Sequence, residues 1–322
     1  MSIFDQLNYN NNYIAITDDS RQFKYADLEN FSNKIKCFIK KRSIVFCLCK
    51  NNIETLFGYC SFIKNKVVPL MLEASINIDL LNSLINIYSP KFIWLPEELI
   101  VNFSDWEILY SIHGYVLVRN NSNNYYSIHN DLALLLTTSG STGSAKLVRL
   151  SYENLKSNAI SISKYLSIDK NERPITTLPI SYSFGISIIN SHLINGATIL
   201  LTNKSLMERK FWSFLEQEKC TSLSGVPFTF EMLKKLRFYN MDLPSVTTIT
   251  QAGGKMNIDL NSELAKFCKK NNKRLFIMYG QTEASPRMSY LPYQKAISKL
   301  GSVGIAIPGG EFNIIDHNDE VI

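Results

Sequence analysis

Residues 132–150 read Leu132-Ala-Leu-Leu-Leu-Thr-Thr-Ser-Gly-Ser-Thr-Gly-Ser-Ala-Lys-Leu-Val-Arg-Leu150. An apolar run of strand length, from Leu132 to Leu136, precedes a loop of glycines and hydroxyl residues, and apolar residues return at Leu147 and Val148. The pattern predicts a strand, a polar loop and a second strand. Glycines can adopt positive φ and present successive backbone N–H groups, so the loop suits phosphate oxygens. We expect phosphate contacts from Thr138, Ser139, Gly140, Ser141, Thr142, Gly143 and Lys146.

This loop has two other interpretations. A P-loop NTPase needs an adjacent Gly-Lys followed by Ser or Thr and then a helix, whereas Lys146 follows Ala145 and a strand-like run comes next. The loop could also be a Ser- and Gly-rich surface segment. A lysine at the loop exit, together with a buried type of strand at the entrance, favours phosphate binding.

Residues 138–146 resemble the phosphate-loop signature of the adenylate-forming superfamily, which comprises acyl- and aryl-CoA synthetases, peptide-synthetase adenylation domains and luciferases. The family usually has Pro where Ala145 stands and Gly where Leu147 stands, and neither change removes a donor. The resemblance implies ATP and Mg²⁺, a small carboxylic acid as substrate, and CoA or carrier-protein phosphopantetheine as acyl acceptor. An acyl carrier protein is therefore a possible partner.

The segment Met278-Tyr-Gly-Gln-Thr-Glu-Ala284 resembles the Tyr-Gly-x-Thr-Glu motif of the same family. Tyr279 would offer an aromatic face to adenine, Thr282 a hydroxyl group to the α-phosphate, and Glu283 a carboxylate oxygen to Mg²⁺. Gly280 and Gln281 complete this part of the nucleotide site. Alone, a Thr-Glu pair would more often cap a helix.

Two further segments carry the resemblance. Gly253 and Gly254 follow an expected strand and correspond to the adenine-facing loop, although a pair of glycines after a strand is usually only a turn. Tyr182, Phe184 and Gly185 correspond to the substrate pocket near the reacting carboxylate. Tyr182 could instead pack at the start of a helix. The Phe-Asp pair with which amino-acid-activating members bind the ammonium group is absent, which disfavours an ordinary α-amino acid.

Composition limits the class of protein. The 322 residues are 45% hydrophobic and 19% charged, with a net charge of +6, which is typical of a globular protein without a nucleic-acid-binding surface. No apolar run approaches the ~20 residues of a membrane helix, and no secretory signal is visible, so we expect a cytoplasmic protein. The six cysteines lie mostly in apolar runs and are expected to be reduced thiols.

Alternating strand and helix patterns predict an α/β fold with two doubly wound, mostly parallel sheets and flanking helices, packed in one compact unit. We expect βαβ units at about residues 1–165 and 166–300 and the start of a third, β-rich segment at 301–322. The expected helices include residues 25–41, 53–63, 78–88, 183–193 and 259–270, and the expected strands include residues 43–49, 66–71, 91–95, 175–178, 197–201, 246–250, 275–278 and 311–316. Residues 13–25 are expected to form a hairpin, whereas residues 96–130 give no clear pattern.

The sequence thus predicts the AMP-binding large domain of an adenylate-forming ligase, without the family's small C-terminal domain. In such a ligase the acid attacks the α-phosphate of ATP to give acyl-AMP and pyrophosphate, with Lys146, Thr282 and Glu283 aligning and stabilising the charges. Two alternatives stay open. The chain could be a nucleotide-binding module without synthetic activity, because the C-terminal domain is missing, or a P-loop kinase or ATPase.

Overall fold

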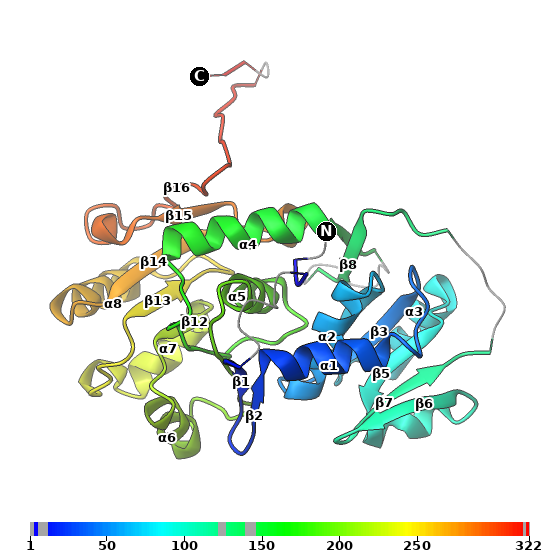
Figure 1. Ribbon diagram of the computed structural model, residues 1–322. Coiled ribbons are helices and arrows are strands. Elements are labelled where there is room, and N and C mark those ends of the chain that lie inside the picture. Colours follow the sequence, from blue (N-terminus) through cyan, green and yellow to red (C-terminus); the bar gives the residue numbers. More distant parts are fainter. Residues whose placement is uncertain (1–2, 6–11, 122–126, 139–145, 318–319, 322) are drawn as a thin grey trace.

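The computed structural model describes residues 3–5, 12–121, 127–138, 146–317 and 320–321 (Figure 1). These residues form two sheets with flanking helices, as the alternating pattern predicts. In Figure 1 the seven-stranded sheet lies on the right and the nine-stranded sheet on the left, with α5 (Ser183–Leu193) between them and α4 (Tyr152–Leu166) running across both. No helix within the described residues is both long and apolar enough to cross a bilayer.

The seven-stranded sheet is mixed. Its central strands pair in parallel, and the strands toward both edges pair antiparallel to their neighbours. Residues 96–130, which gave no clear pattern, supply two of these strands. In spatial order the strands are β6 (Glu107–Ile112), β7 (Tyr115–Arg119), β5 (Phe92–Pro96), β3 (Ile44–Cys49), β4 (Val68–Glu73), β8 (Leu132–Leu136) and β9 (Val148–Ser151).

The nine-stranded sheet is parallel through its centre and carries antiparallel strands at both edges. In spatial order its strands are β16 (Ile305–Ala306), β15 (Ser289–Leu291), β14 (Arg274–Tyr279), β13 (Thr248–Gln251), β12 (Ser222–Gly225), β10 (Pro174–Ile175), β11 (Ile199–Leu200), β1 (Ile14–Thr17) and β2 (Gln22–Lys24). The carboxyl ends of β12, β13 and β14 therefore lie side by side, where doubly wound sheets bind ligands.

Helices cover the faces of both sheets. The remaining ones are α1 (Tyr25–Ile35), α2 (Ile53–Lys64), α3 (Ile78–Tyr88), α6 (Arg209–Gln217), α7 (Pro227–Lys235) and α8 (Ile258–Lys270). Helices α4 and α5 connect the two sheets, because their apolar residues belong to two different clusters of the core. Leu155 and Ile186 pack in the cluster beneath the seven-stranded sheet, whereas Tyr165 and Phe184 pack with Phe276 of β14.

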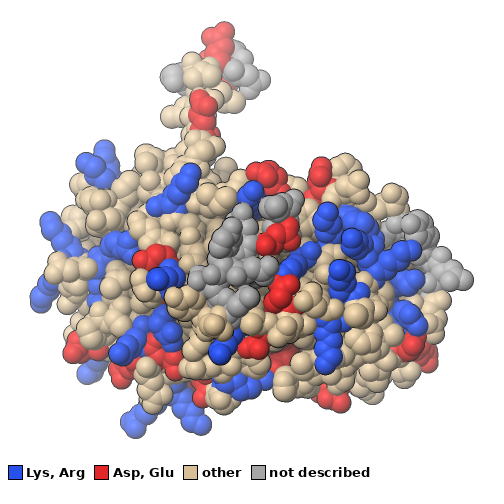
Figure 2. Space-filling view, in the orientation of Figure 1, with Lys and Arg blue, Asp and Glu red and all other residues tan. Residues whose placement is uncertain are grey.

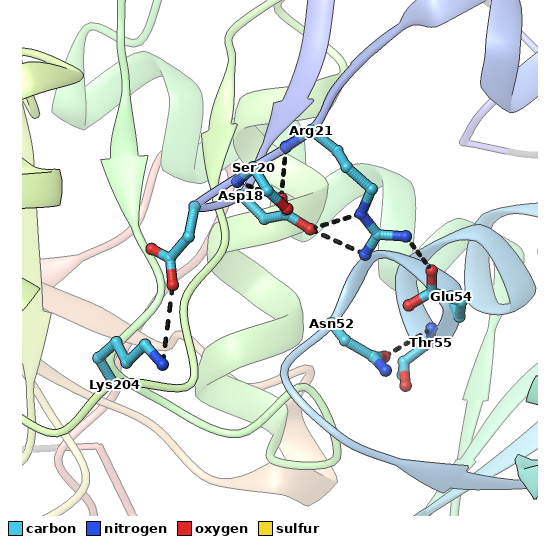
Figure 3. Close-up of polar contacts among 8 residues, drawn as sticks. Asp18, Ser20, Arg21, Asn52, Glu54, Thr55 and Lys204 are labelled. Carbon is cyan, nitrogen blue, oxygen red and sulfur yellow. Dashed lines mark hydrogen bonds and ion pairs between the residues drawn. The ribbon is translucent and has the colours of Figure 1, made fainter. Parts of the chain in front are cut away.

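The hairpin expected at residues 13–25 is present, and it belongs to the nine-stranded sheet, because β1 pairs in parallel with β11. The Asp18 carboxylate accepts hydrogen bonds from the backbone N–H groups of Ser20 and Arg21 and so shapes the turn. Arg21 extends from this turn to Glu54 at the start of α2, with 2.7 Å between Nη1 and Oε1 (Figure 3). The two sheets thus do not follow the chain as consecutive halves, and the division at residue 165 stays a prediction.

Two predictions about elements are wrong: where one helix ends, and whether one strand forms. Helix α1 ends at Ile35 and not near residue 41. The N–H groups of Cys37 and Phe38 bond three residues back and tighten the chain, and Phe38 stacks on Tyr110 with 5.4 Å between ring centroids. Residues 311–316 form no strand. They leave the body of the molecule (Figure 1), and the one bridge there among the described residues joins Ile315 to Val321. A strand needs a neighbouring strand to be stable.

The charges on the surface are mixed. Figure 2 shows basic, acidic and neutral residues over this face, with Lys and Arg gathered most densely on its right-hand part.

Candidate active site

A cleft of about 830 Å³ opens at the carboxyl ends of β13 and β14. Segments that are far apart in the sequence line it together, namely Thr138, residues 182–184, 251–256, Asn261, residues 277–283, 286–287 and 301–303. Four of the segments singled out in the sequence therefore meet at one place. Because the strands are parallel and adjacent, the loops that follow them share one edge of the sheet.

The segment after β14 is held tightly in place. Gly280 is needed there because a Cβ atom would lie 1.5 Å from the carbonyl oxygen of Pro286. Gln281 donates a hydrogen bond of 2.8 Å to the hydroxyl of Tyr279, whose ring is 37% exposed and available to a ligand. The Thr282 hydroxyl lies 3.0 Å from that of Ser183 at the start of α5. Tyr279, Gly280, Gln281, Thr282 and Glu283 all line the cleft.

The loop after β13 faces this segment across the cleft. Gly253 adopts φ +81°, and a Cβ atom there would lie 2.8 Å from the Tyr182 hydroxyl. Gln251 is buried, and its side-chain amide donates to the carbonyl oxygen of Gly254 over 2.8 Å. A side chain would therefore collide with Tyr182 at Gly253, and the hydrogen bond from Gln251 holds the backbone at Gly254.

The expected substrate-pocket residues divide into two groups. Tyr182 and Phe184 line the cleft, with their rings edge to face and 6.5 Å between centroids. Gly185 is not among the lining residues. Its role is packing, because a Cβ atom there would lie 2.2 Å from the carbonyl oxygen of Pro179.

The expected phosphate loop is described only at its ends. Ser139, Gly140, Ser141, Thr142 and Gly143 lie outside the described residues. Thr138 lines the large cleft and also a neighbouring cavity of about 330 Å³, which Lys146 and Glu73 line as well. The structure therefore places Lys146 beside the cleft and not in its wall.

Glu283 is an exposed carboxylate in the wall of the cleft. Within the described residues, no group of three or more His, Cys, Asp or Glu side chains could hold a metal ion by itself. A cation at Glu283 would therefore take its other ligands from bound phosphate and water, which is the usual arrangement for Mg²⁺.

Two buried side chains in the cleft wall were missed by the sequence reasoning. Asn261 of α8 and Arg287, which precedes β15, are each 3% exposed, and Oδ1 of Asn261 has no hydrogen-bond partner among the described residues. Burial lowers the pKa of Arg287 and raises that of Tyr165, which contacts it. The only sequence signal for Arg287 was its position shortly after Glu283, and a single arginine in a loop usually lies at the surface.

Sequence comparison identifies related ligases. The profile of the AMP-binding enzyme family matches residues 3–322. A 2-succinylbenzoate–CoA ligase of Listeria innocua is 29% identical over 187 residues, which are 58% of this chain and 39% of that protein. A feruloyl-CoA synthase of Amycolatopsis is 28% identical over 54% of this chain and 35% of its own length, and the mitochondrial medium-chain acyl-CoA ligase ACSF2 of Mus musculus is 30% identical over 56% and 30%. Each match spans well under half of the relative.

Solved structures share the fold. VinN superimposes with a TM-score of 0.82 at 19% identity, covering 100% of this chain and 85% of VinN. The O-succinylbenzoate coenzyme A synthetase of Bacillus subtilis in complex with AMP gives a TM-score of 0.80 at 19% identity, covering 99% of this chain and 66% of that one. The fold is thus that of the large N-terminal domain of adenylate-forming enzymes, as the sequence motifs predicted. The profile match along nearly the whole sequence shows that the chain belongs to the AMP-binding enzyme family.

Proposed function

We propose that this chain activates a carboxylic acid with ATP, giving acyl-AMP and pyrophosphate, and that the acyl group then passes to a thiol of CoA or of a carrier-protein phosphopantetheine, or to an amine. The observation that carries the proposal is the cleft itself, which brings together the loop after β13, the segment after β14, the start of α5 and Thr138. An acyl carrier protein as partner and a cytoplasmic location are parts of the same proposal.

The cleft fits a nucleotide. The backbone of Gly253 and Gly254 and the exposed side chain of Tyr279 line the same cleft. Tyr279 is therefore assigned to adenine stacking, and the Thr282 hydroxyl, oriented by Ser183, to the α-phosphate. Thr138 begins the loop that would hold the β- and γ-phosphates, and Lys146 would approach them from the neighbouring cavity.

Glu283 fits a Mg²⁺ ion, because a single carboxylate together with phosphate oxygens and water satisfies this cation. When bound, Mg²⁺ neutralises charge on the phosphates and so favours departure of pyrophosphate. The side chains of the protein contribute by aligning the reacting groups. Thr282 positions the α-phosphorus, and Tyr182 and Phe184 hold the acid beside it.

The relatives do not select one substrate. They are named for 2-succinylbenzoate, ferulate and medium-chain acids, which differ in size, charge and polarity. We therefore propose a carboxylic acid as the class of substrate.

Exchange of labelled pyrophosphate into ATP tests the proposal, with fatty, aryl, hydroxy and amino acids offered in turn. A ligase of this class shows acid-dependent exchange. A kinase or ATPase releases no pyrophosphate, and a module without synthetic activity binds ATP but exchanges none. Normal ATP binding without exchange for any acid of the panel would favour the binding module.

A further inference from the structure

Arg287 is a buried cation without an acidic partner. Its Nε donates to Ser187 Oγ over 3.2 Å, and its Nη1 lies 3.2 Å from the Tyr165 hydroxyl and 2.6 Å from Met278 Sδ. The guanidinium carbon lies 4.3 Å from the ring centroid of Phe184. All of these partners are neutral. Among the described residues, no Asp or Glu side chain forms a hydrogen bond or an ion pair with Arg287.

Burying an unpaired guanidinium group costs free energy unless a negatively charged ligand binds to it. Neutral hydrogen bonds and an aromatic face offset only part of the cost of removing a charged group from water, and buried charges are normally paired. Arginine does not escape the cost by losing its proton. His192, at the far side of the same small cavity, brings no opposite charge, because burial lowers the pKa of its ring to about 4 and leaves it neutral.

The position of Arg287 relative to Thr282 indicates which part of a ligand would contact it. Both side chains contact α5, Thr282 through Ser183 and Arg287 through Ser187. Four residues of helix correspond to a rise of about 6 Å, so Arg287 lies one turn deeper along α5 than the hydroxyl assigned to the α-phosphate. Phe184, against which Arg287 stacks, lies between these two points in the sequence and lines the cleft.

A small cavity adjoins Arg287 and is lined by both polar and apolar side chains. It measures about 10 Å³, room for about one water molecule, and hydroxyl groups on β12 and β13 line it together with Leu166, Ile168 and Ile188. Ser224 and Thr250 hydrogen bond to each other there over 2.8 Å, and the buried Ser222 hydroxyl has no partner among the described residues. Glu172, also in the lining, lies 3.6 Å from Arg274.

We propose that Arg287 binds an anionic group on the acyl part of the substrate, so that the acid carries a second negative charge besides the carboxylate that reacts. The inference rests on the proposed function, since it assigns the substrate class of the same cleft. The second anionic group then lies about one turn of α5 away from the hydroxyl assigned to the α-phosphate. Arg287 is a specificity-determining residue and takes no part in the bond changes.

The test compares acids that differ in one charge. Succinate and glutarate are titrated calorimetrically against their monoamides, which keep the shape but lose one negative charge, with and without AMP. The wild-type chain should bind each diacid about 10- to 100-fold more tightly than its monoamide, the range of a charge-assisted contact. Arg287→Met should bring this ratio close to one, and Arg287→Lys should retain part of it. Lys299→Met, which removes one exposed positive charge outside the cleft, serves as the control and should keep the wild-type ratio.

The outcomes separate the two proposals. Binding of ATP and AMP, measured on the same samples, reports on the nucleotide site and should be unchanged in every variant. If the wild-type chain bound neither ATP nor AMP, this would count against the proposed function. The acid titrations without AMP would still decide the role of Arg287. The inference is overturned if the wild-type chain does not distinguish diacid from monoamide, if it binds neither, or if Arg287→Met keeps the ratio. If Arg287→Met does not fold, the ratio of diacid to monoamide affinity in the wild-type chain and in Arg287→Lys decides whether the inference holds.

Discussion

Replacement of Gly280 by alanine would place a methyl group on the carbonyl oxygen of Pro286. The Cβ atom would lie 1.5 Å from that oxygen and 3.0 Å from Cα of Arg287, whereas ordinary contacts begin near 3.4 Å. Both neighbours are backbone atoms, so the segment that carries Tyr279 and Thr282 must move away by an appreciable fraction of the missing 1.9 Å (3.4 minus 1.5). A shift of this size exceeds the tolerance of a hydrogen bond, which fails beyond about 3.5 Å between heavy atoms.

Loss of the Thr282 contact to the α-phosphate corresponds to about 1.5–3 kcal/mol, or about 10- to 150-fold in Kd for both AMP and ATP. Overpacking should also lower the stability by about 1–3 kcal/mol. Calorimetric titration with AMP, well below the unfolding temperature, measures the first effect and thermal unfolding the second. Gly254→Ala is the matched control, because its Cβ atom would lie 3.2 Å from a side-chain carbon of Pro227. This variant should lower the affinity for AMP only a few-fold. Unchanged AMP affinity in Gly280→Ala would refute the reasoning.

Three further predictions address other parts of the site and the core. Lys146→Ala should weaken ATP binding more than AMP binding, by about 1.5–3 kcal/mol, because the lost charge would face the β- and γ-phosphates; equal losses in calorimetry would contradict this role. Glu283→Gln should leave the thermal stability unchanged and reduce the Mg²⁺ dependence of ATP binding, since the amide keeps the shape but not the charge; an unaltered Mg²⁺ titration would make Glu283 structural. Burial lowers the pKa of His192 from 6.5 to about 4, so its contribution to stability is complete above pH 6.5 and is lost as the pH falls toward 4. Urea unfolding at pH 7 and pH 4.5 should therefore show that the wild-type protein loses about 2–3 kcal/mol more than His192→Gln, and parallel pH profiles would disprove it.

Several parts of the site could be predicted because they follow buried strands. The residues of β13 and β14 are apolar or β-branched and fully buried along most of their length, so their carboxyl ends can be recognised in the sequence. Adjacent parallel strands then bring Gly253 and Thr282 to the same edge without further assumptions. This edge of the cleft was therefore predictable from local sequence patterns and from the rule that adjacent parallel strands end at the same edge of a sheet.

The parts that could not be predicted depend on contacts between distant residues. Pairing of Ile16 with Ile199 decides that the N-terminal hairpin joins the second sheet, and no local pattern contains that information. Arg287 is buried only because Phe184 and Tyr165, on two different helices, close around it. The same limit applies to Lys146, which follows the loop in sequence but lies in a neighbouring cavity.

The pairing of β1 with β11 affects the order in which the sheet can form during synthesis. Ile14–Thr17 leave the ribosome about 180 residues before Ile199–Leu200, a delay of roughly 10 to 40 s at ordinary rates of translation. During that interval β1 can pair only with β2, and afterwards β11 has an open edge until the hairpin joins it. The hairpin is thus made early and joins the rest of its sheet late, and a failure of this step would leave β11 with an open edge through which newly made chains can aggregate.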